Sequence, residues 1–165
     1  MLTAAAAIVR SREAPWPILK GVSWSVLPLV AGLFVLVEAL ARTGAVTALA
    51  GALSSASNAS HAAAAAGAGT AVAVASNLVN NLPAGLIASG AIAQAHPPLK
   101  VVDALLIGVD LGPNLSITGS LATILWLNAI RREGEDVGFR RFIKVGVLVM
   151  PPALALAIGV RLLIG

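Results

Sequence analysis

The chain has 165 residues, of which 58% are hydrophobic and 11% are charged. Soluble domains are about 45–50% apolar and about 25% charged, so this composition argues against a soluble domain and predicts an all-α integral membrane protein. The net charge is +4, but the basic residues punctuate apolar runs, which argues against a nucleic-acid-binding protein. The absence of cysteine excludes disulfides and thiolate metal sites.

The first predicted membrane span covers residues 22–41. The preceding segment, residues 1–21, is not typical of a signal peptide, because its basic residues follow a short apolar run instead of preceding it. We expect this segment to be cytoplasmic, and we expect Pro28 to kink the span. Residues 43–58 are small and only mildly apolar, which predicts a short connecting helix.

A re-entrant helical hairpin is predicted over residues 62–95. Its first apolar run, residues 62–76, would extend only about 22 Å as a helix, against roughly 30 Å for the hydrocarbon core. The polar stretch SNLVNNLP, residues 76–83, separates this run from a second short apolar run, residues 83–95. Two short helices that meet at a polar break are expected to enter and leave the membrane on one side.

A discontinuous transmembrane helix is predicted over residues 101–130. Its two apolar halves flank the polar stretch DLGPNLSITGS, residues 110–120. A charged loop, RREGEDVGFRR, follows, and the last span is predicted over residues 142–164.

The positions of the basic residues predict the orientation. With the N-terminus in the cytoplasm and the C-terminus outside, eight Lys and Arg residues lie inside and three lie outside. The positive-inside rule therefore favours this arrangement. A hairpin made of two full spans would also return the chain to the side from which it started. The rule therefore does not distinguish a re-entrant hairpin from two full spans.

The two polar breaks are the candidate site. Irregular backbone at membrane depth persists only inside protein or beside a water-filled cavity, and paired interrupted segments indicate the binding site of a secondary transporter. We expect Asn81 to cap the helix after the first break, and Ser116 or Thr118 to cap the helix after the second. Gly112 and Pro113 are expected to end the helix before them. Asp110 would be an intramembrane carboxylate, which by default indicates a functional site.

The stretches ASNLVNNLPAGLIASGA and IGVDLGPNLSITGSLATILWLNAIRR resemble the arsenical pump membrane proteins, the arsenite efflux carriers. These carriers belong to an ion-transporter superfamily that also contains sodium/proton antiporters and dicarboxylate carriers. The resemblance runs from about Trp16 to the end of the chain. Family members are longer and are built as two inverted repeats, so the resemblance implies that this chain is the C-terminal half.

The resemblance also implies a site and partners. The substrate would be arsenite or antimonite, a small inorganic oxyanion or hydroxide, exported across the inner membrane by the proton gradient or with an arsenite-stimulated ATPase. The partner would be an N-terminal half or a second copy of the chain. The implied substrate- and ion-binding residues are Asn77, Asn80, Asn81, Asp110, Gly112, Pro113, Asn114, Thr118, Gly119 and Ser120.

Three alternatives stay open at this point. The chain is compatible with a sodium/proton antiporter, with an organic-anion carrier, or with a membrane fragment that does not transport. We expect no enzymatic activity, no cofactor and no metal site, because the sequence contains no evident nucleophile–base pair and no cluster of metal-ligating residues. His61 and His96 stand alone.

Overall fold

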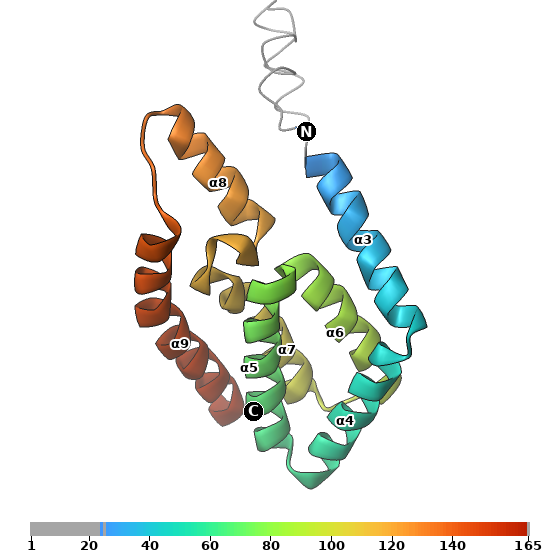
Figure 1. Ribbon diagram of the computed structural model, residues 1–165. Helices are drawn as coiled ribbons and strands as arrows, with labels where there is room; N and C mark the ends of the chain where they lie inside the picture. Colours follow the sequence, from blue (N-terminus) through green and yellow to red (C-terminus); the bar gives the residue numbers. More distant parts are fainter. Residues whose placement is uncertain (1–23, 25, 165) are drawn as a thin grey trace, which may run out of the picture. The chain divides into compact units, whose positions relative to one another are not determined.

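The computed structural model describes Trp24 and residues 26–164, and every regular element in this part of the chain is a helix (Figure 1). The predicted cytoplasmic segment, residues 1–21, therefore lies outside the described residues. The internal contacts divide the chain after Ala31, and the packing reported below is that of residues 32–164.

Seven α-helices and two short 3₁₀ turns make up the described chain. Their bounds are α3 Val26–Arg42, α4 Ala45–Ala59, α5 His61–Val79, α6 Asn81–Ala95, α7 Leu99–Leu111, η1 Gly112–Leu115, η2 Ile117–Gly119, α8 Leu121–Arg132 and α9 Phe139–Ile164.

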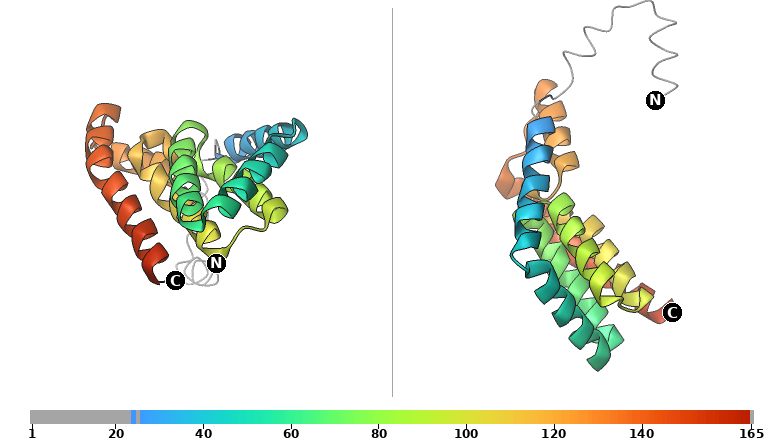
Figure 2. Two further views of the ribbon diagram at one scale, coloured as in Figure 1. Left: turned by 90° about the horizontal axis from the view of Figure 1, so that it is seen from below. Right: turned by 90° about the vertical axis from the view of Figure 1, so that its right-hand side faces the viewer.

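Helix α5 is the centre of the packing, and its most extensive partner is α7. A Cβ atom at Gly69 of α5 would lie 2.6 Å from the carbonyl oxygen of Ala104 in α7, and one at Gly108 of α7 would collide with the backbone of Gly69. These glycines let the two backbones approach closely, as small residues do between membrane helices. Helices α4, α5 and α6 also lie side by side (Figures 1 and 2).

Two of the described helices are long and apolar enough to cross a membrane singly, α5 and α9. Helices α3 and α4 meet the same criterion only together, across a bend of 69°. Gly44, at this bend, has a φ of 83°, which glycine adopts without strain. Pro28, where a kink was expected, lies in the first turn of α3, and a proline there breaks no helical hydrogen bond.

Helix α5 is longer than the sequence predicted. Its 19 residues span about 28 Å, so length no longer argues that the hairpin is re-entrant. Ser76 and Asn77 are accommodated within the helix, and each satisfies its polar side chain by donating to the carbonyl oxygen four residues earlier, at 2.8 Å to Val72 and 2.9 Å to Ala73. The break is confined to Asn80, after which α6 begins.

The predicted discontinuous helix is present as α7 and α8, separated by η1 and η2. Helix α7 ends at Leu111, directly before Gly112 and Pro113, as predicted. Helix α9 begins three residues earlier than expected, at Phe139, and contains Pro151 and Pro152. Helices α5 and α7 both reach the second break, which brings the two polar stretches of the sequence together.

Candidate functional site

Asn77 connects the last turn of α5 to the second break. Its Nδ2 donates to the carbonyl oxygens of Ala73, at 2.9 Å, and Gly112, at 2.7 Å. Its Oδ1 accepts a hydrogen bond of 2.9 Å from the Ser116 hydroxyl. Both Nδ2 hydrogens and the amide oxygen are therefore engaged, and the bonds to Gly112 and Ser116 cross between segments more than 30 residues apart in sequence.

Asn80 and Thr118 add a second set of bonds between the breaks. Asn80 has a φ of 76° and caps α6 by accepting from the Leu82 N–H at 3.3 Å. Its Nδ2 donates to the carbonyl oxygen of Thr118 at 3.2 Å, and the Thr118 hydroxyl donates to the carbonyl oxygen of Asn77 at 3.3 Å. We call this hydrogen-bonded set, made by Asn77, Asn80, Gly112, Ser116 and Thr118, the break joint.

Two glycines allow the break joint to close. A Cβ atom at Gly112 would collide with the backbone of Ala73. At Gly119 it would lie 2.5 Å from the carbonyl oxygen of Pro113 and 2.8 Å from Asn77 Oδ1. Gly112, Pro113 and Gly119 are all buried, so these positions serve close backbone packing.

The helix caps differ from those predicted. Asn80, not Asn81, caps α6, and Ser120 caps α8 by accepting from the Ala122 N–H at 3.1 Å. Ser116 and Thr118 bond to Asn77 instead of to the start of α8.

Three other predicted site residues, Asn81, Asp110 and Asn114, take no part in the hydrogen bonds of the break joint. Asn114 donates to the carbonyl oxygens of Asp110, at 3.3 Å, and Leu111, at 3.0 Å, and its Oδ1 has no partner among the described residues. Asp110 is exposed. The carboxylate of Asp110 and the amide of Asn81 form no hydrogen bond within the described part of the chain. The ten predicted residues thus fall into two groups. Some hold the two breaks together, and the others have polar atoms that could contact a ligand.

The bond between Ser116 and Asn77 and a charged contact between α7 and α9 were not predicted. Arg161 donates to Asp103 at 2.6 Å, and the Lys100 ammonium donates to the carbonyl oxygen of Leu162 at 3.1 Å. Asp103 and Arg161 each expose about a quarter of their side chain. The only signal in the sequence is the cost of leaving such charges unpaired in apolar surroundings, and it does not identify the partners.

The described residues contain no group of three or more His, Asp or Glu side chains placed to hold a metal ion. The polar chemistry of the two breaks comes from amides, hydroxyls, helix ends and the carboxylate of Asp110. Such groups can bind a small hydroxylated solute or a cation by hydrogen bonds and partial charges.

Comparison with known proteins gives a family match over nearly the whole chain. Residues 5–164 match the family described as arsenical pump membrane protein. The arsenical pump membrane proteins of Yersinia enterocolitica and Escherichia coli K12 are 28% and 29% identical over 146 residues, which is 83% of this chain and 33% of each relative. An uncharacterized transporter of Mycobacterium bovis is 30% identical over 84% of this chain and 34% of its own length.

The chain spans about a third of the length of these curated relatives. No solved structure matches. The family match covers both breaks and all the helices that surround them. This helical membrane protein therefore belongs to the arsenical pump membrane protein family.

Proposed function

We propose that the chain is part of a secondary membrane transporter that exports arsenite and its antimony analogue. The family match supports membrane transport of arsenicals. The single structural observation that carries the proposal is the break joint, in which two interrupted helical segments meet through Asn77. Paired interruptions of this kind are the usual position of a transporter's binding site.

In this proposal the break joint holds the helix ends, and the residues beside it contact the solute. Asn81, Asn114 and Ser120 supply amide and hydroxyl groups to the hydroxyls of a trivalent arsenic species. The N-terminal ends of α6 and α8 add partial positive charge, which favours oxygen-rich ligands. A Cβ at Gly85, one turn beyond Asn81, would lie 3.4 Å from Val109. Asn81 lies one turn earlier, on the same face of α6 as Gly85.

Asp110 is assigned the coupling role. It lies in the last turn of α7, and its exposed carboxylate has no bonding partner among the described residues. An unpaired carboxylate near a membrane-embedded break is well suited to exchange a proton or bind a cation while the solute moves in the opposite direction. Asp110→Asn keeps the shape of the side chain and removes this charge.

The proposed carrier lies in the inner membrane with the N-terminus of this chain in the cytoplasm and its C-terminus outside. Because the chain spans about a third of its relatives, we propose that transport requires an N-terminal half or a second copy. An arsenite-stimulated ATPase is a further proposed partner.

The test is arsenite accumulation in a host that lacks its own efflux pump. The host expresses the chain alone, or with a candidate N-terminal half, and the chain's presence in the membrane is checked in both. We expect less accumulation with the wild type and no reduction with Asp110→Asn.

Unchanged accumulation in both expression conditions would contradict the proposal. Parallel assays of sodium/proton exchange and organic-anion uptake would then distinguish another transporter of the superfamily from a fragment that does not transport.

A further inference from the structure

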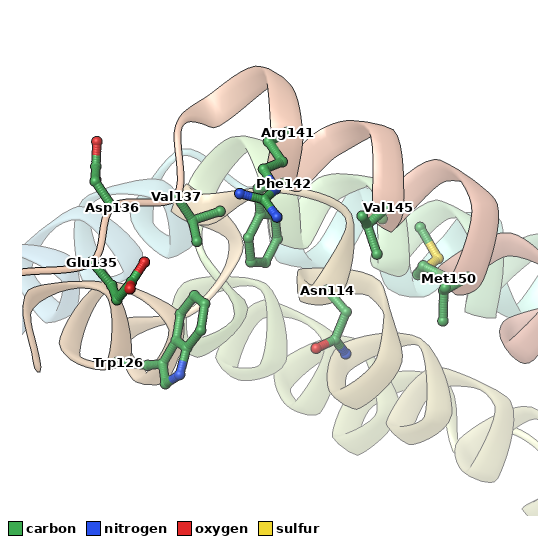
Figure 3. Close-up of a pocket in the computed structure, with 11 residues that line it drawn as sticks. Asn114, Trp126, Glu135, Asp136, Val137, Arg141, Phe142, Val145 and Met150 are labelled. Atoms are coloured by element: carbon green, nitrogen blue, oxygen red, sulfur yellow. The ribbon is translucent and has the colours of Figure 1, made fainter. Parts of the chain in front are cut away.

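A pocket of about 470 Å³ lies between the second break, α8 and α9, apart from the hydrogen bonds of the break joint (Figure 3). Its lining comes from four segments of the chain: Asn114 from η1, Trp126 from α8, Glu135–Val137 from the charged loop, and α9. One end of the pocket is therefore formed by the break, and the other by the exposed loop.

The walls of the pocket are apolar and its two ends are polar. Trp126 and Phe142 face one another with ring centroids 6.5 Å apart, and Val145, Val149 and Met150 continue the apolar wall along α9. Asn114 provides an amide oxygen that has no partner among the described residues. A concave apolar site with a few orienting polar groups is the usual form of a small-molecule site.

The contact between α9 and the break fixes the inner end of the pocket. A Cβ atom at Gly146 of α9 would lie 2.6 Å from the carbonyl oxygen of Leu115 and 2.8 Å from that of Asn114. This close contact holds α9 against η1 next to Asn114. The inner end of the pocket therefore lies directly beside the break.

The charged groups at the loop end are balanced. Asp136 pairs with Arg131 at 2.7 Å, while Glu135 and Arg141 line the pocket without an ion-pair partner among the described residues. Because Asp136 is paired with Arg131, the pocket lining keeps one unpaired carboxylate, Glu135, and one unpaired guanidinium, Arg141, so a solute there meets both an acceptor and a donor. Trivalent arsenic in neutral water is an uncharged trihydroxide, whose hydroxyls can donate to Glu135 and accept from Arg141 at the loop end, or donate to the Asn114 oxygen at the inner end.

We infer that this pocket is the loop-side entry site for the solute, and that it takes small uncharged hydroxylated molecules such as trivalent arsenic hydroxide. The inference rests on the proposed function, because it assigns the route by which the exported solute reaches the break. It adds a binding site at residues that the sequence did not indicate, above all Trp126, Glu135, Arg141 and Phe142.

The test uses the 165-residue chain purified in detergent micelles and sodium arsenite as the probe, with bound arsenic measured by equilibrium dialysis. Val145→Trp and Val149→Trp fill the pocket from α9. Val147→Trp is the matched control, because Val147 is similarly exposed (55%, against 59% and 56%) but does not line the pocket. Asn114→Ala is a smaller change that removes the orienting amide if the tryptophan variants fold poorly.

We expect the two pocket-filling variants and Asn114→Ala to weaken arsenite binding about tenfold or more, and Val147→Trp to change it less than about twofold. Arsenite binding by Val145→Trp and Val149→Trp that equals that of Val147→Trp would overturn the inference, even if cells still export arsenite through an Asp110-dependent route. If the wild-type chain binds no arsenite, alone or with its proposed N-terminal half, and the two together export none from cells, this inference and the proposed function are overturned together.

Discussion

Asn77 is the residue on which the contact between the two breaks depends. Its amide forms three hydrogen bonds, to Ala73, Gly112 and Ser116, and two of them bridge separate segments. Both N–H groups of the Asn77 amide are used within the protein, so the side chain has no donor left for a solute. At the scale of single residues, the structure therefore separates Asn77, which joins the breaks, from Asn114, whose oxygen remains available.

Asn77→Leu should lower stability more than Asn114→Leu. Interhelical hydrogen bonds in membrane proteins contribute about 0.6 kcal/mol on average, so losing those of Asn77 should cost about 1–2 kcal/mol. Asn114 donates only to nearby carbonyl groups of its own segment, so its loss should cost less. Unfolding of the purified variants in detergent by heat or denaturant measures the difference. Equal stability of the two variants would show that the break joint does not hold the fold together.

The sequence predicted which stretches interrupt the helices, but not which residue caps each helix. Asn80 caps α6 because its backbone adopts a φ of 76° and brings its oxygen to the Leu82 N–H. The sequence does not distinguish Asn80 from Asn81 as the capping residue, because both have the same side chain. The backbone conformation determines which of them caps the helix. The bonds of Asn77 were also beyond prediction, because they join residues 35 and 39 positions apart.

Helices α5 and α7 pack closely because glycines lie at their contact. Gly69 faces the Ala104 carbonyl oxygen, whereas a Cβ at Gly67, two residues earlier in the same helix, would meet no atom within 4 Å. The two glycines therefore form a matched pair in which only one supports helix packing.

Gly69→Ala should destabilise the protein, while Gly67→Ala should leave stability unchanged or raise it. Overpacking a tight contact costs about 1–3 kcal/mol, whereas alanine in place of an unconstrained helical glycine gains about 0.5–1 kcal/mol. Melting temperatures in the same detergent compare the two variants. A Gly69→Ala protein as stable as Gly67→Ala would contradict the packing of α5 on α7.

At the scale of elements, composition predicted helices and polar breaks but misjudged the length of α5. Ser76 and Asn77 were expected to begin the break because they are polar. In the structure both are helical, and their side chains are satisfied by donating to carbonyl oxygens four residues earlier. The effect of a proline likewise depends on its position in the helix. Pro28 lies in the first turn of α3, where it breaks no helical hydrogen bond.

The whole molecule carries its basic residues unevenly. Five of them lie between Arg131 and Lys144, around the loop that joins α8 to α9. The proposed orientation, which follows the positive-inside rule, puts this loop in the cytoplasm and the end of α6 on the other side of the membrane.

Because the chain has no cysteine, single-cysteine variants can test this orientation directly. Glu133→Cys, in the loop, and Gln94→Cys, in the last turn of α6, replace exposed residues. We expect a membrane-impermeant maleimide to label Gln94→Cys in intact cells and Glu133→Cys only in inside-out vesicles. Labelling of both variants from the same side would refute the proposed topology.

The membrane class and the family could be predicted from the sequence because composition and two long motifs carry that information over the whole chain. The pocket beside Trp126 could not be predicted, because it depends on how the loop and α9 pack against the break. Apart from Asn114, the polar residues that line it belong to a charged stretch in which the sequence shows no sign of a site.

The most direct test of the central claim is arsenite uptake by inside-out vesicles that contain the chain with its proposed partner half. Wild type is compared with Asp110→Asn and with Glu133→Gln, a matched removal of an exposed carboxylate in the loop. We predict proton-gradient-driven uptake by wild type and Glu133→Gln, and none by Asp110→Asn. Equal uptake by all three would contradict the coupling role of Asp110, and no uptake by any would contradict arsenite transport.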